Sequence, residues 1–135
     1  MVAAPPAALI IWGVSVAHVL VCFDGSERSC RALADATSAA RASGARLTVL
    51  ALAAVEAPAR CCNMQTTMWN REMRRLADEA ISQARLLVEP DLQAEFVIRN
   101  GSTRRQVAAA AAELGCDVII EPARRGRSRQ RPVAA

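Results

Sequence analysis

The chain has 135 residues and 53% of them are hydrophobic, which is enough for one domain with a sizeable core and too apolar for a disordered protein. All of its basic side chains are arginines, and the net charge of +4 depends on five near the end: Arg124, Arg125, Arg127, Arg129 and Arg131. Without these five the chain carries 12 arginines and 13 acids, a balance that excludes a domain body built to bind nucleic acid.

Residues 1–16 form an apolar extension ahead of the first predicted strand. The run ALIIWGVSVAHVLVCF has the hydropathy of a membrane span or a signal segment. A signal peptide, however, begins with basic residues, and no lysine or arginine precedes Arg28. Pro5, Pro6 and Gly13 keep the region from forming a clean run of the ~20 apolar residues that a spanning helix needs. We therefore expect no contact with a membrane.

The five cysteines form no familiar metal-binding or disulfide pattern. Three of them fall within or beside apolar segments, as small buried thiols do: Cys22, Cys30 and Cys116. The adjacent Cys61 and Cys62 lack C-x-x-C spacing, and the single histidine, His18, is far from them in sequence. We expect no metal site and a protein of the reducing cytoplasm.

The first half of the chain predicts a strand, a helix and a second strand. Residues 18–23 (HVLVCF) are continuously apolar, which is typical of a buried strand. Ser26 can cap a helix that runs to about Ser43, and Gly44 can close it. Residues 47–52 (LTVLAL) predict the second buried strand.

A long amphipathic helix follows a loop in the middle of the chain. Apolar residues recur at helical spacing from Met73 to Val88, Leu76 and Leu87 among them, with charged residues on the opposite face. Pro90 ends this helix. The segment EFVIR at residues 95–99 predicts a third strand.

A third helix, capped by Ser102 or Thr103 and closed by Gly115, leads to a fourth apolar strand at residues 118–120. Strands that alternate with helices of this length form parallel sheets with right-handed crossovers. The sequence therefore predicts a small doubly wound α/β domain over residues 17–122, with a parallel sheet of four strands and helices on both faces.

Open parallel sheets bind ligands beyond the carboxyl ends of their strands. At that edge the sequence offers Asp24-Gly25-Ser26, residues 52–54 and residues 122–126. A carboxylate such as Asp24 suits a ribose hydroxyl or a cation, and the backbone amides of a glycine-rich loop suit phosphates. Taken alone, however, Asp24 is more typical of a turn and helix-cap residue.

Three blocks of the sequence, HVLVCFDGSERSCRAL, ASGARLTVLAL and VIRNGSTRRQVAAAAAELGCDVII, resemble the universal stress protein family over most of residues 17–121. Their order and spacing are similar to that family's V-D-G-S, G-A-x-L and V-x-x-G-x-P segments, with Thr103 in place of the proline. The resemblance implies a Rossmann-like sheet of the adenine-nucleotide α-hydrolase-like kind, frequent dimers, and a role in stress survival or signalling without a defined catalytic reaction.

Nucleotide-binding members of that family hold ATP with the aspartate after the first strand, a residue that ends the second strand, and a G-x-x-G-x9-G-(S/T) loop after the fourth. The resemblance carries the first two parts of this site onto the following residues: Phe23, Asp24, Gly25, Ser26 and Leu52.

The phosphate loop of the family does not carry over, because its glycine positions fall on Pro122, Arg125 and Ala135. Proline lacks an N–H and arginine disfavours positive φ, so this loop cannot cradle phosphates in the family's way. The helix and the fifth strand that follow the loop in the family are missing from the pattern.

These observations leave three interpretations of function. The first is a non-catalytic stress-response or regulatory domain of the universal stress protein type, with lost or weakened adenine-nucleotide binding. In the second, arginines replace the glycine loop, and the protein binds AMP, or ATP with Mg²⁺: Arg124, Arg125 and Arg127 pair with the phosphates, while Gly126 is one residue out of register with the family's glycines. In the third, the arginine-rich tail at residues 123–135 makes weak contact with nucleic acid or another anionic polymer.

Two further expectations concern the tail and catalysis. No aromatic residues interleave with the arginines of the tail, so it cannot stack on bases, and we expect it to be disordered. An enzyme has the least support, because no nucleophile–base pair and no carboxylate cluster stand out. We therefore expect no catalytic residues.

The fourth strand, at residues 118–120, would be an apolar sheet edge without a fifth strand beside it. We expect self-association through this strand, most simply as a homodimer, unless the N-terminal extension masks it or the protein is poorly soluble. A truncated or frameshifted reading frame would produce such an abrupt arginine-rich end.

Overall fold

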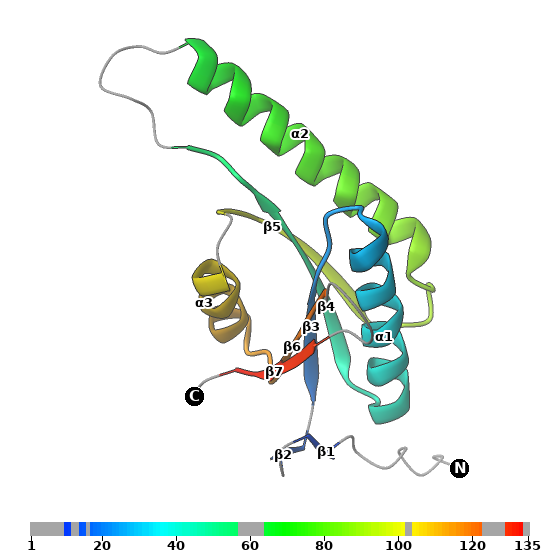
Figure 1. Ribbon diagram of the computed structural model, residues 1–135. Helices are drawn as coiled ribbons and strands as arrows, with labels where there is room; N and C mark the ends of the chain where they lie inside the picture. Colours follow the sequence, from blue (N-terminus) through cyan, green and yellow to red (C-terminus); the bar gives the residue numbers. More distant parts are fainter. Residues whose placement is uncertain are drawn as a thin grey trace.

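The computed structural model describes residues 10–11, 14–15, 17–56, 64–101, 104–122 and 129–133. Within these ranges, a five-stranded sheet has the order β5-β4-β3-β6-β7 (Figure 1). Its strands are β3 (His18–Cys22), β4 (Arg46–Ala53), β5 (Ala94–Asn100), β6 (Val118–Glu121) and β7 (Arg129–Pro132). The helices are α1 (Glu27–Ser43), α2 (Met64–Leu87) and α3 (Arg104–Leu114), and a small antiparallel pair is formed by β1 (Ile10–Ile11) and β2 (Val14–Ser15).

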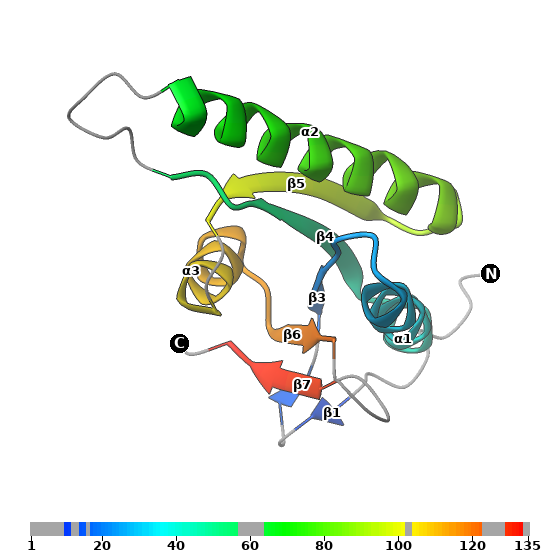
Figure 2. The ribbon, with the colours of Figure 1, turned by 45° about the horizontal axis from the view of Figure 1, so that its top comes forward.

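The first four strands of the main sheet are parallel, with β3 between β4 and β6. Helices α1 and α2 cover one face and α3 covers the other (Figure 2). The predicted α/β class, a parallel sheet with helices on both faces, is confirmed. The turn of direction after β5, which returns the chain to the other side of β3, creates the switch point at which such sheets bind ligands.

The core consists of two layers that share the central strand β3. Val19 and Val21 pack into the layer under α1 and α2, whereas Leu20 packs into the layer under α3. This two-sided burial explains why residues 18–23 read as a continuous apolar run instead of an alternating one. Both helical layers rely on alanine, which lets α1, α2 and α3 lie close to the sheet.

The tail differs from the prediction, because residues 129–132 form β7. This strand pairs antiparallel with β6, from Val118 opposite Pro132 to Glu121 opposite Arg129. The expectations of a missing fifth strand and of a disordered end are therefore wrong for this segment, and β6 is not a free edge through which copies could associate. An arginine-rich segment can form this strand because, at a sheet edge, the charged ends of the long side chains stay in water while their apolar stems lie along the protein surface.

Asp117 joins three strands at the beginning of β6. Its Oδ2 accepts hydrogen bonds from the backbone N–H groups of Ala17 (2.8 Å) and His18 (2.9 Å), and its own N–H donates to the His18 carbonyl (2.8 Å). Its carbonyl accepts a hydrogen bond from Val133, just after β7 (3.0 Å). These bonds fix the height at which β3 and β6 start, and so align their carboxyl ends.

Helix α1 has the predicted ends. The Ser26 side chain accepts a hydrogen bond from the Ser29 N–H, and Gly44 takes the left-handed conformation (φ 67°) that closes the helix. Helix α2 begins at Met64, nine residues before the first position of the predicted periodic face, and it exposes Leu76 and Leu87, which were expected to be buried. The buried residues of α2 are smaller on average: Ala77, Ala80, Ile81 and Ala84.

None of the helices in the described ranges is long and apolar enough to cross a membrane. Most of the N-terminal extension and both possible caps of α3, Ser102 and Thr103, lie outside these ranges.

Replacing Ser26 with alanine is expected to lower the free energy of unfolding by about 1 kcal/mol, because the Ser29 N–H loses its acceptor at the start of α1. Urea unfolding followed by circular dichroism measures the change. Ser43→Ala is the matched control, since its hydroxyl donates to the Ala39 carbonyl at the other end of the same helix, and it should cost less than about 0.5 kcal/mol. Equal losses in the two variants would contradict the capping role.

We expect the protein to lose stability in mild acid, because His18 is buried in its neutral form. The residue is 6% exposed, and its Nε2 lies 2.6 Å from the Thr48 hydroxyl. Burial lowers the pKa of the imidazole below its usual value, and the charge of Arg46 lowers it further, against weaker opposing effects of Asp117 and Glu95. The unfolded chain therefore takes up the proton first, so the stability held by neutral His18 is complete above about pH 6.5 and is lost as the pH falls toward the folded-state pKa.

Unfolding free energies measured at pH 7.5, 6.5 and 5.5 for the wild type and for His18→Gln test this coupling. The variant, which has no titrating ring, is expected to show a flatter pH dependence over this range. Parallel curves for the two proteins would show that another group is responsible.

Candidate ligand-binding site at the carboxyl edge of the sheet

A cavity of about 270 Å³ lies where the carboxyl ends of the parallel strands meet. Phe23 and Asp24 follow β3, Leu52 ends β4, and Pro122 follows β6. The remaining lining residues are Cys22, Leu50, Ala54 and Gly101. The structure thus brings together five residues that the sequence analysis placed at this edge from three separate segments: Phe23, Asp24, Leu52, Ala54 and Pro122.

A second cavity, of about 390 Å³, lies on the α2 side of the same edge. Phe23, Asp24, Leu52 and Ala54 line both cavities. The second cavity adds Gly25 and a wall from α2 that includes exposed Leu76. The α2 wall was not predicted, because Leu76 was expected to be covered by the sheet.

Asp24 has a local structural role at the end of β3. Its Oδ1 accepts a hydrogen bond from the Ser26 N–H (2.8 Å), while its own N–H donates to the Ser29 hydroxyl (3.3 Å). Gly25 lies between them with φ 86°, a conformation that a side chain would strain. Ser26 caps α1 and lines neither cavity.

The Asp24 carboxyl is nevertheless ionised at neutral pH. Burial raises its pKa, but hydrogen bonds from Ser26 and Ser29 outweigh this effect and hold the pKa below its usual value. An ionised carboxylate between two cavities is able to accept hydrogen bonds from a hydroxylated ligand such as a ribose.

The Cys22 thiol at the same edge stays protonated. Burial raises its pKa to about 12, and the nearby charge of Glu121 acts in the same direction. Because the thiolate is the reactive form of cysteine, this residue does not serve as a nucleophile at neutral pH. Nowhere in the described ranges do three or more His, Cys, Asp or Glu side chains group closely enough to hold a metal ion.

Gly101, after β5, closes the cavity on the side of α3. Its N–H donates to the Ala53 carbonyl (2.8 Å), and its φ of 142° is one that favours glycine. The Gln106 side chain occupies the space where a Cβ at position 101 would lie. The backbone conformation at position 101 therefore favours the glycine that the sequence shares with the V-x-x-G segment.

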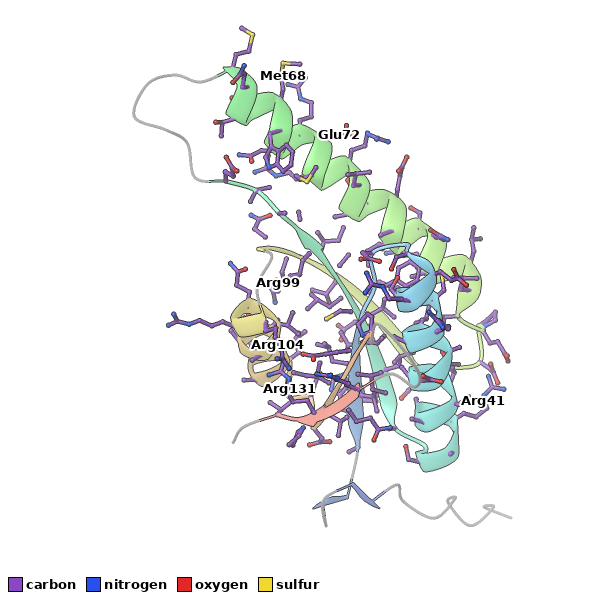
Figure 3. All side chains as sticks on the ribbon, in the orientation of Figure 1. Arg41, Met68, Glu72, Arg99, Arg104 and Arg131 are labelled. Carbon is purple, nitrogen blue, oxygen red and sulfur yellow. The ribbon has the colours of Figure 1, made fainter. Side chains whose placement is uncertain are left out.

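Glu121 forms an ion-pair cluster at the end of β6 that sequence reasoning missed. Its carboxylate accepts hydrogen bonds from Arg104 of α3 (3.0 Å) and from Arg131 of β7 (2.7 and 3.1 Å). Figure 3 labels both arginines, one from α3 and one from β7. Glu121 is the last residue of a strand at the ligand edge, and that position is the signal that could have identified it.

The connection from β6 to β7 comprises residues 122–128. A G-x-x-G-x9-G loop is longer than this connection, so β7 begins before such a loop could be completed. Arg124, Arg125 and Gly126 fall in this connection and lie outside the described residues. Of the five tail arginines, Arg131 is paired with Glu121.

The fold and the position of these cavities define a doubly wound α/β domain whose candidate ligand site is at the switch point of the sheet. A family model of the universal stress protein family matches residues 16–133. The chain belongs to this family, which confirms the resemblance noted in the sequence.

Solved structures support the same fold. Universal stress protein UspA from Lactobacillus plantarum is 18% identical, with a TM-score of 0.67 over 80% of this chain and 77% of that chain. A universal stress protein family member from Burkholderia pseudomallei is 21% identical, with a TM-score of 0.57 over 80% of this chain and 82% of that chain. A search of curated proteins found no match to the sequence.

Glu121→Gln is expected to lower the free energy of unfolding by about 1–2 kcal/mol, because two arginine contacts to a mostly buried carboxylate are weakened together. Hydrogen exchange should speed up most along β6 and β7. Glu72→Gln is the control, since it removes an exposed pair with Arg75 within α2 and should change the stability much less, because water screens such a pair. A loss as small as that of the control, with unchanged exchange in β7, would show that the cluster does not hold the strand.

Proposed function

We propose that this protein is a non-catalytic, cytoplasmic member of the universal stress protein family that has lost or greatly weakened adenine-nucleotide binding. It would act in a stress response through association with partners or with itself. The observation that carries the proposal is the short return from β6 to β7, which leaves no room for the family's phosphate loop.

The charge of Glu121 at the strand ends supports the proposal that phosphate binds only weakly here. Glu121 places a carboxylate beside Pro122, where the family's loop begins, and it is already paired with Arg104 and Arg131. A polyphosphate at this position would have to compete with Glu121 for both arginines and would meet its negative charge. Pro122 also offers no N–H to a phosphate oxygen.

The chemistry of the described residues supports a role without catalysis. Cys22 is held as a thiol at the cavity. His18, which is the chain's only general base of the imidazole type, is buried against Thr48 at the opposite end of β3. A binding or regulatory role needs neither a nucleophile nor a base at the site.

The adenosine end of the site supports a second candidate, a module that binds AMP or ATP weakly. Phe23, Leu52 and ionised Asp24 line a cavity of about 270 Å³, close to the size of small-ligand pockets. If the arginines of residues 124–127 supplied the phosphate contacts, affinity would increase from adenosine to AMP to ATP with Mg²⁺ and would fall steeply with salt.

Isothermal titration calorimetry with adenosine, AMP and ATP–Mg²⁺ separates the two candidates. We expect no heat of binding with any of the three at millimolar concentration, and no shift of the melting temperature. Saturable binding of ATP that weakens in salt and is lost in an Arg124→Ala/Arg125→Ala variant would overturn the proposal in favour of the second candidate. Asp24→Asn is the control for contacts to the ribose.

A further inference from the structure

The two edges of the sheet differ in length and chemistry. Strand β7 has four residues, Arg-Gln-Arg-Pro, and ends on a proline that cannot donate a ladder hydrogen bond. Short, charged, proline-containing edges are protected from pairing with other strands. Strand β5 has seven residues, all in register with β4, and nothing in the described part of the chain pairs with its outer side.

We propose that β5 pairs antiparallel with β5 of a second copy of this chain, centred on Val97. In this register Glu95 lies opposite Arg99 of the other copy and Phe96 lies opposite Ile98. Each of these pairs occurs twice because of the two-fold symmetry. Opposite charges and aromatic with β-branched residues are the favourable cross-strand pairs of antiparallel sheets.

The register is specified by the charges. If the centre moves by one residue, either Glu95 or Arg99 lies opposite Val97 and both ion pairs are lost. Glu95 and Arg99 are two residues either side of the centre, so side-chain alternation puts both on the same face as Val97. That face is the α3 side, because Val97 packs with the α3 layer and Arg99 contacts Glu113 of α3 (3.2 Å).

Among the residues that the structure describes, Arg99 has one buried hydrogen-bond donor without an acceptor. Its Nη2 donates to Glu113, whereas its Nε is buried and has no acceptor in the described part of the structure. Figure 3 shows Arg99 beside α3, at the end of β5. The carboxylate of Glu95 from a second copy would bring an acceptor to this guanidinium.

The opposite face of β5 supplies the apolar part of the contact. Phe96 packs at the edge of the α1 and α2 layer, with the Arg85 guanidinium 5.3 Å from the centre of its ring. Ile98 is 37% exposed, which is high for a large aliphatic residue in a strand. Pairing Phe96 with Ile98 of the other copy would cover this surface. The proposal does not depend on whether a nucleotide binds at the strand ends.

Charge reversal tests the pairing. Sedimentation equilibrium of the full chain, over the widest concentration range that the protein tolerates, is expected to show a monomer–dimer equilibrium. Glu95→Arg and Arg99→Glu alone should each raise the dissociation constant by about tenfold or more, because both attractive pairs become repulsive. The double variant E95R/R99E should restore dimerisation.

Mixing the two single variants gives the sharpest result. One copy then carries arginine at both positions and the other glutamate at both, so we expect a heterodimer about as stable as the wild-type dimer. Complementation of this kind excludes misfolding of either variant as the cause of its weakened self-association.

Two controls separate this surface from others. Glu113→Gln removes the intrachain partner of Arg99, and Gln130→Glu adds a charge to the other edge strand, β7; both should dimerise like the wild type. A wild-type protein that stays monomeric, single variants with unchanged dissociation constants, mixed variants that do not associate, or a dimer broken by Gln130→Glu alone would each overturn the proposal.

Discussion

The carboxylate of Asp117 sets the alignment on which the sheet and its candidate site depend. By accepting hydrogen bonds from two consecutive N–H groups at the start of β3, it fixes β3 against β6. The backbone of the same residue continues the ladder to Val133, beside β7. Because strands of similar length that start level also end level, this contact brings Asp24 and Pro122 to one cavity. A site at the carboxyl ends of the strands is thus positioned by a carboxylate at their amino ends.

Much of the fold could be predicted, because it depends on local signals that the sequence shows directly. Continuous apolar runs marked the strands, and Ser26 and Gly44 marked the ends of α1. Strand β7 could not be predicted, because RQRP has neither apolar residues nor alternation. It exists through pairing with β6 and through the contact of Arg131 with Glu121. The start of α2 was missed for a related reason: its first turns expose Met64 and Met68 and so show no buried face.

Only the part of the candidate site that lies at the ends of individual strands could be predicted from the sequence. Phe23, Asp24 and Leu52 line the cavity. Asp24 and Leu52 could be placed at this edge because one directly follows an apolar run and the other ends one, whereas Phe23 was implied by the family resemblance. The contribution of α2 and the Glu121 cluster depend on segments brought together only by tertiary structure. The replacement of the family's glycines was visible in the sequence. The sequence did not show that β7 returns antiparallel to β6, which is the physical reason that the loop is too short.

The central position of β3 also determines the order in which the domain can be assembled during synthesis. One side of β3 pairs with β4, which follows about one helix later, but the other side pairs with β6, about a hundred residues further along. Until β6 has left the ribosome, one edge of this buried strand stays open. The centre of the sheet is therefore completed only after β3, β4 and β5 have been made, and contacts between such distant segments are slow to form.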